Sequence, residues 1–426
     1  MKFILHIRFV FLLLIFSAVS FNLSAQYEAP LYTSYTTIQA RAAMVQRINA
    51  NTINGNLHLP LSDSTEENWM DAFDAMEVFK VSNPFTFHKI AHAFDSVQSR
   101  NIPFQKKLLE LAYANYPGKF YSPVAGLLKQ TTDPKIFAFC AEYLIQHGHR
   151  DSIHIVDSLL RKKFGDSLVY NPVLFMLMNR IHPSKQQLSS QQVFQQLFSK
   201  YFLPGQVVMF TIQKKDRDYP GLVIFRDAAG NFVKDSSGKY LHIPQLARSI
   251  SNLPSYLTNG NTPQGIFRMY GFRISMSSFI GPTANVQMGM PVELSKQKFF
   301  NDSSILDSVW KVGDYQRLLG NALSSYTPLY EAWYAGLAGR TEIIAHGTTL
   351  DPEIYKSMHY YPLTPTQGCL STKEIWDGKR LESDQQKLVN GLLKAGGANG
   401  YCVVIEIDDQ KAPVDINDLL PYLPHK

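Results

Sequence analysis

Cysteine is scarce in this chain of 426 residues, which contains only Cys140, Cys369 and Cys402. Because three is an odd number, at least one thiol stays unpaired within the chain. Cys140 lies in an apolar helical pattern and Cys402 in an apolar strand pattern, which predicts two buried core residues. Cys369 instead follows a turn-forming Thr-Pro-Thr-Gln-Gly run. Its placement is the feature that needs a chemical explanation.

Long hydrophobic runs are absent except for one near the N-terminus, from Phe9 to Ala18. A short basic start precedes this run and small residues follow it at Ser24 and Ala25, which is the layout of a secretory signal peptide. The run is short for the roughly 20 residues of a membrane span. We therefore expect cleavage of residues 1–25 and export of the mature protein to the periplasm or cell envelope, with no stable membrane span.

Runs of Lys and Arg interleaved with aromatic residues are also missing, which argues against a nucleic-acid-binding module. The formal net charge of +6 is therefore interpreted as a solvated surface. His88 and His92 have the i, i+4 spacing of half a zinc site. No third ligand completes such a site nearby, so we expect an ordinary helix surface there.

The pattern of apolar residues divides the chain into two parts. Apolar residues at i, i+3 and i+4 predict several helices within residues 26–202, punctuated by Asn-Pro and Asp-Pro pairs. Runs such as QVVMFTIQ and GYCVVIEID predict a mostly β domain with inserted helices over residues 203–410, followed by a tail over residues 411–426. The predicted fold class is α+β, with an all-α N-terminal domain of unknown role.

Three short segments of the second part contain the residue types that nucleophilic catalysis needs. They are NTPQGIFRMYG at residues 261–271, TEIIAHGTTLDP at residues 341–352, and the segment around Cys369. A thiolate is the reactive form of cysteine and needs a base or a cation beside it. His346 ends an apolar run, and the Gly347 carbonyl can accept a hydrogen bond from one ring nitrogen. The other nitrogen then faces the thiol, as in Cys–His pairs on many folds.

The segment around Cys369 has further features of a nucleophile site. The glycine at 368 permits a tight turn, so the amides of Gln367, Gly368 and Cys369 are expected to form an oxyanion hole. Ser371 and Glu374 have the spacing of a capping box, which predicts that a helix begins directly after the cysteine. A helix N-terminus at this point lowers the pKa of a thiol.

These residues resemble the L,D-transpeptidase catalytic domain family, the YkuD-like fold of bacterial cell-wall enzymes. The resemblance covers about residues 203–410, and three motifs carry it: TPQGIF at 262–267, HGT at 346–348 and TQGCL at 366–370. It implies that Cys369 is the acyl-forming nucleophile, His346 its base, and the Gly347 carbonyl the group that orients the imidazole. The implied substrate is the stem peptide of peptidoglycan, without a metal or organic cofactor. We expect Tyr361, Thr366 and Ser371 to contact this substrate.

Two departures from the family pattern leave the reaction outcome open. Gln367 replaces the usual His, and Ser371 replaces the usual Arg or Asn. The aromatic run around Tyr360 is interpreted either as a lid or as a surface loop. Three functions therefore remain: an L,D-transpeptidase-like acyl transferase, a hydrolase of the same fold that acts as a carboxypeptidase or releases wall-linked peptides or proteins, and a catalytically silent wall-binding protein. The oligomeric state stays unknown.

Overall fold

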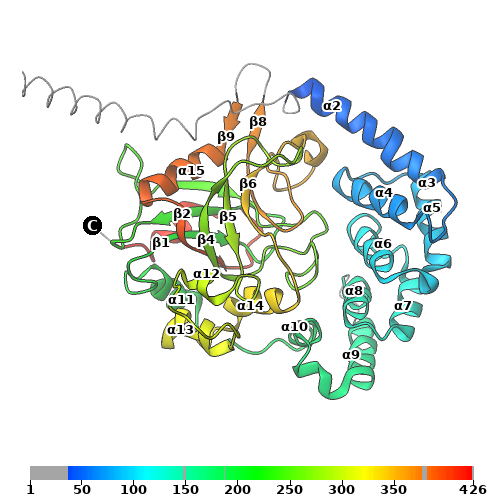
Figure 1. The fold of residues 1–426 in the computed structure, drawn as a ribbon, viewed down its shortest axis with the longest axis horizontal. Helices are drawn as coiled ribbons and strands as arrows, with labels where there is room; N and C mark the ends of the chain where they lie inside the picture. The colour runs from blue at the N-terminus through cyan, green and yellow to red at the C-terminus, as the bar shows by residue number, and fades with distance from the viewer. Residues whose placement is uncertain (1–36, 147–149, 187, 377–380, 425–426) are drawn as a thin grey trace, which may run out of the picture.

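The computed structural model describes residues 37–146, 150–186, 188–376 and 381–424 (Figure 1). A row of helices is followed along the chain by a large mixed sheet with helices inserted between its strands. The predicted α+β class is therefore confirmed. The predicted signal peptide lies outside the described residues. Within the described part of the chain, no helix combines the length and the apolar character that crossing a bilayer requires.

The first part is a curved row of helices that lies along one side of the sheet (Figure 1). Its α-helices are α2 (Ile38–Arg47), α3 (Asn56–His58), α4 (Glu66–Val78), α5 (Pro84–Asp95), α6 (Ile102–Asn115), α7 (Tyr121–Gln130), α8 (Pro134–Ile145), α9 (Arg150–Phe164), α10 (Pro172–Ile181) and α11 (Ser190–Phe198). The π-helical segment η2 (Ile48–Gly55) joins α2 to α3, and 3-10 turns η3 (Val97–Ser99) and η4 (Gly165–Val169) follow α5 and α9.

Side-chain caps explain why several of these helices begin where they do. Asn83, Asn101, Asp133 and Asn171 each accept a hydrogen bond from a backbone N–H in the first turn of the helix that follows. Each is followed at the first or second helical position by proline, whose missing N–H is not needed there. Such caps contribute about 1 kcal/mol each. The Asn-Pro and Asp-Pro pairs thus delimit the helices as the sequence predicted.

The second part is an eight-stranded sheet that closes into a near-barrel. Its strands are β1 (Val207–Gln213), β2 (Gly221–Arg226), β3 (His242–Gln245), β4 (Gly265–Arg273), β5 (Asn285–Gly289), β6 (Ala345–Gly347), β7 (Leu370–Thr372) and β10 (Asn399–Glu406), in the order β3-β2-β1-β10-β4-β5-β6-β7. The β1–β10 and β6–β7 pairs are parallel. Leu246, which follows β3, exchanges two backbone hydrogen bonds of 2.8 Å with Ser371 of β7 and so joins the two ends of the sheet.

Helices cover the sheet and fill its ends. They are α12 (Lys296–Phe300), α13 (Val312–Leu323), the turn η5 (Thr327–Tyr330), α14 (Glu331–Leu337) and α15 (Asp384–Ala395). The last helix of the first part, α11, packs into the same buried cluster as β1, with Phe198 against Phe210 at a ring separation of 5.1 Å. The predicted C-terminal tail also packs there, because Leu419 of α16 (Ile416–Leu419) and Leu423 are buried in that cluster.

The helix predicted directly after Cys369 does not form. Residues 370–372 form β7, and residues 374–376 form β8, which pairs with β9 (Leu381–Ser383) in a separate hairpin. The backbone of Ser371 pairs with His346 of β6 on one side and with Leu246 on the other. Pairing on both edges outweighs the local capping signal, because each extended residue gains hydrogen bonds from segments distant in sequence.

The two parts of the molecule have separate apolar cores that a loop of the second part joins. Leu253, Tyr256 and Leu257, which lie in the loop between β3 and β4, are buried in the same cluster as the side chains of α4, α6, α8 and α10. Glu142 of α8 is fully buried and accepts a hydrogen bond of 2.6 Å from the Tyr256 hydroxyl. The helical row is therefore packed against the sheet, and the loop between β3 and β4 is fixed from its outer side.

Candidate active site

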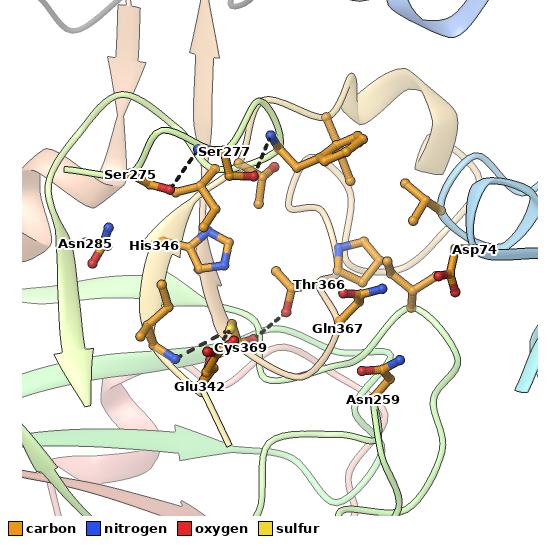
Figure 2. A pocket seen from close by; sticks show the side chains of 18 of the residues that line it. Asp74, Asn259, Ser275, Ser277, Asn285, Glu342, His346, Thr366, Gln367 and Cys369 are labelled. Carbon is orange, nitrogen blue, oxygen red and sulfur yellow. Dashed lines mark hydrogen bonds between the residues drawn. The ribbon is translucent and has the colours of Figure 1, made fainter. Parts of the chain in front are cut away.

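A cavity of about 1070 Å³ lies between the helical row and the open side of the sheet (Figure 2). One wall comes from η2 and α4, and the opposite wall comes from β4, β5, β6 and the turn before β7. Cys369 and His346 both line this cavity, together with Thr366 and Gln367. A cavity of this size accommodates a peptide-sized ligand.

The Cys369 thiol is held between backbone groups of the segment that leads into β6. Its sulfur accepts the Ile344 N–H at 3.5 Å and donates to the Glu342 carbonyl at 3.4 Å. Burial raises the pKa of this thiol to about 11, although the Ile344 N–H and the nearby Arg340 charge act in the opposite direction. Because no helix begins at this point, the expected lowering of the thiol pKa by a helix N-terminus is wrong. The resting site therefore contains a neutral thiol that needs a base.

His346 is suited to be that base. Its side chain is 4% exposed, and burial lowers the pKa of the imidazole below its ordinary value. Its Nδ1 lies 2.7 Å from the Gly347 carbonyl, so Nδ1 carries the proton because a carbonyl only accepts. The N–H of Gly281 donates to the same carbonyl at 2.7 Å. The contact that the sequence predicted is thus present, and Nε2 is left as a proton acceptor.

Strand pairing places the segments that carry the imidazole and the thiol next to each other. His346 is paired with Ser371 in the parallel β6–β7 ladder, and Cys369 lies in the bend directly before β7. The Cys369 sulfur contacts the N–H of Ile344, two residues before His346. Figure 2 shows both side chains in the cavity.

Of the three amide groups expected to form an oxyanion hole, one is already hydrogen-bonded among the residues that the structure describes and two are not. The Gly368 N–H already donates to the Thr366 hydroxyl at 3.2 Å. The N–H groups of Gln367 and Cys369 have no hydrogen-bond partner in the described part of the chain. Two of the three predicted donors are therefore available to a developing oxyanion, and the third maintains the turn.

Thr366 holds the turn that presents the thiol. Its hydroxyl accepts the Gly368 N–H and donates to the Cys369 carbonyl at 2.8 Å. Its own carbonyl accepts the Ile250 N–H at 2.7 Å. The side chain lines the cavity as expected, but its hydroxyl is occupied within the protein. Thr366 is thus placed to maintain the turn as well as to border the substrate.

The two other residues predicted to contact substrate lie elsewhere. Ser371 is fully buried, and its hydroxyl donates to the Thr364 carbonyl at 2.6 Å. Tyr361 is exposed and donates to the Glu353 carboxylate at 2.7 Å, outside the residues that line the cavity. The structure therefore does not bring these two hydroxyls into the cavity, because neighbouring protein groups, which the sequence does not reveal, accept their hydrogen bonds.

The proposed aromatic lid is also absent from the cavity. Tyr360 is buried against Tyr355, at a ring separation of 5.8 Å, and His359 stacks on Tyr219 at 4.8 Å. This loop contains the 3-10 turn η6 (Pro352–Tyr355) and packs on the helical row, where the Tyr355 hydroxyl donates to the Val78 carbonyl at 2.7 Å. The aromatic run is therefore a packed loop beside the site.

Sequence reasoning missed the contribution of the helical row to this cavity. Asp71 and Asp74 of α4 line it opposite the thiol, and Glu293 and Glu342 line it from the sheet. The one Arg or Lys among the lining residues is Arg273. Asp74 is paired with Lys107 of α6 at 2.5 Å. Asp71, Glu293 and Glu342 still give the lining an excess of negative charge, which favours a substrate with a cationic group. No spacing in the sequence signals this arrangement, because α4 is almost 300 positions from Cys369.

Neither metal ligation nor a known relative assigns a function to this site. Among the residues that the structure describes, no cluster of three or more His, Cys, Asp or Glu side chains is placed to hold a metal ion. His88 and His92 accordingly lie on α5 without further ligands. Comparisons of the chain with protein-family models, with curated proteins and with solved structures found no match.

Proposed function

We propose that this protein is a cysteine-dependent acyl transferase of the L,D-transpeptidase type, with a YkuD-like catalytic domain, which acts on peptidoglycan stem peptides in the cell envelope. One observation carries the proposal: a thiol, a neutral imidazole of fixed tautomer and two unpartnered amides border the same cavity. This set supplies the nucleophile, the base and the oxyanion donors of acyl transfer.

The first half-reaction forms a thioester. The Cys369 proton passes to Nε2 of His346 as the sulfur attacks the carbonyl carbon of the stem peptide. The carbonyl oxygen becomes an oxyanion that accepts hydrogen bonds from the amides of Gln367 and Cys369. The C–N bond then breaks, and the imidazolium returns its proton to the amine that leaves.

The second half-reaction resolves the thioester. His346 removes a proton from an amine of a second stem peptide as that amine attacks the thioester carbonyl. The C–S bond breaks, and the proton returns to the sulfur. Of the four carboxylates that line the cavity, Asp74 is paired with Lys107, and the other three favour binding of a substrate that carries free amino groups.

A hydrolase outcome is the second candidate, and Gln367 favours it. This residue is exposed beside the thiol at the position where the family usually has a titratable His. A glutamine amide can hydrogen-bond a water molecule, but it does not titrate and so adds no second base to His346 for an attacking amine. With water as the acceptor, the same thioester yields a shortened stem peptide.

Purified muropeptides test the proposal and separate its two outcomes. We expect the full chain to convert them to 3-3 dimers or, if it is a hydrolase, to shortened monomers, which product masses distinguish. Cys369→Ala should abolish both products, whereas Cys140→Ala should retain them. Incubation with a carbapenem should add one acyl group, located at Cys369 by digestion. Full activity of Cys369→Ala would exclude the enzyme, and no adduct at any cysteine would favour a silent wall-binding protein.

A further inference from the structure

Arg340 is a buried cation that lies behind the turn containing Cys369. It follows α14 and a left-handed glycine, Gly339, with a φ of 82°. The side chain is 6% exposed. Its guanidinium donates to the carbonyls of Gly260 and Asn261, at 2.8 Å each, and also to the carbonyl of Ser255. It therefore holds the loop that leads into β4.

This guanidinium has no carboxylate partner. Within the described residues, the hydrogen bonds of Arg340 go to carbonyl oxygens, and Glu331, Glu110 and Glu293 act on its charge without forming an ion pair with it. Burial lowers the pKa of Arg340 to about 10, and Cys369 is the first of the groups that oppose this lowering. A buried charge without a counter-ion is costly, and the cost falls when an anion forms beside it.

The turn at Gly368 brings the guanidinium to the reactive cysteine. Gly368 has a φ of 109°, and a Cβ atom there would overlap Nη2 of Arg340 and the carbonyl oxygen of Gly260. The carbonyl of Gly368 accepts the Thr262 hydroxyl at 2.9 Å, so the turn is fixed against the same loop. Cys369 is the next residue along the chain. The guanidinium thus lies against the residue that directly precedes Cys369.

We infer that Arg340 is the positive charge that stabilises the Cys369 thiolate, a positioning residue that acts through the sulfur and the turn at Gly368. This inference rests on the acyl-transfer function proposed above. When the S–H bond of Cys369 breaks, the proton forms an N–H bond at Nε2 of His346, and the electron pair stays on sulfur. The anion then forms between the imidazolium and the guanidinium. Arg340 thereby supplies from the opposite side the cation that the sequence lacks at position 371.

The pH dependence of Cys369 alkylation by iodoacetamide tests this role. We expect R340Q to raise the apparent thiol pKa by about one unit, which slows alkylation about tenfold at a fixed pH below that pKa. R340K keeps the charge and should alkylate at least threefold faster than R340Q. The matched control is R317Q, which removes an exposed arginine of α13 outside the residues that line the cavity and should leave the profile unchanged. A folded R340Q protein with the wild-type profile would overturn the inference.

A second measurement uses the unmutated protein and so does not depend on the folding of a variant. Iodoacetate and iodoacetamide add groups of nearly the same shape to Cys369, one anionic and one neutral. Glu342 and Glu293 oppose a negative charge at Cys369. If the attraction of Arg340 outweighs their repulsion, the carboxymethylated protein should melt at a higher temperature than the carbamidomethylated protein. Equal melting temperatures, or the reverse order, would overturn the inference. Neither measurement uses peptidoglycan, so a failed muropeptide assay and a failed charge test give separate results.

Discussion

At the scale of single residues, the chemistry of the site depends on which nitrogen of His346 carries the proton. The Gly347 carbonyl fixes that proton on Nδ1, and burial keeps the ring neutral near pH 7. Gly347 itself has no room for a side chain, because a Cβ atom there would overlap the Glu374 carboxylate. The glycine thus allows close packing around the carbonyl that orients the base.

The lowered pKa of His346 predicts the pH at which the acylation rate falls on the acid side of the pH profile. Acylation of Cys369 by a carbapenem should stay level as the pH falls through 6.5, the ordinary value for histidine, and decline only below it. The unfolded chain binds this proton more readily than the folded chain, so the free energy of unfolding should also decrease as the pH falls below about 6.5. H346Q should slow acylation at least about 100-fold and remove this part of the pH dependence.

Intact-protein mass spectrometry and urea unfolding across the pH range measure both effects. His88, which lies on the surface of α5, provides the control variant H88Q, with no expected change in acylation. An acid limb at or above pH 6.5 would contradict the assignment of His346 as the neutral base.

At the scale of elements, the turn between Thr364 and Leu370 fixes the position of the Cys369 thiol in the cavity. The Thr366 hydroxyl bridges the Gly368 N–H and the Cys369 carbonyl, and Arg340 fills the space behind Gly368. The turn then enters β7, which is paired on both sides. Its geometry is therefore determined by contacts from several distant segments.

Removal of the Thr366 hydroxyl should loosen this turn. T366V loses both hydrogen bonds, so we expect the free energy of unfolding to fall by about 1–3 kcal/mol and carbapenem acylation of Cys369 to slow about tenfold. T366S retains the hydroxyl and should recover most of the acylation rate. Quenched-flow mixing followed by intact-protein mass spectrometry measures the acylation rates. Urea denaturation measures the free energy of unfolding. A wild-type rate in T366V would mean that the turn does not depend on this bridge.

At the scale of the whole molecule, the helical row and the sheet are joined by a buried polar contact as well as by apolar packing. Glu142 of α8 accepts the Tyr256 hydroxyl at 2.6 Å and the Arg180 Nε–H at 2.7 Å. Tyr256 belongs to the loop that Arg340 holds from its inner side. The helical row therefore supports the same loop that lies behind the reactive turn.

Y256F tests this connection. It leaves one oxygen of the buried Glu142 carboxylate without the hydroxyl that donates to it, so the free energy of unfolding should fall by about 1.5–3 kcal/mol. Y121F removes a hydroxyl that is bonded to Ser152 at 3.0 Å near the surface and should change stability by less than about 0.5 kcal/mol. Because Leu253, Tyr256 and Leu257 of the second part are buried in the core of the helical row, urea unfolding of both variants should remain a single transition. A separate early transition in Y256F would show that the two parts unfold independently.

Local signals in the sequence account for the parts of the fold that were predicted. The capped helices form because cap, proline and apolar spacing act within one helical turn. Cys140 and Cys402 are fully buried, as their apolar neighbours indicated. The His346–Gly347 contact joins adjacent residues and was predictable for the same reason. The roles of Cys369 and His346 in catalysis stay predictions.

The sequence alone thus determined the fold class, the starts of the capped helices and the candidate nucleophile and base, because those depend on near neighbours in the chain. Only the tertiary structure decided that residues 370–376 are extended, that Ser371 and Tyr361 bind protein groups, and that α4 forms the acidic wall of the cavity. It also placed Arg340 behind Gly368. The physical reason is that strand pairing and burial of charge depend on segments up to almost 300 positions apart, which no local pattern records.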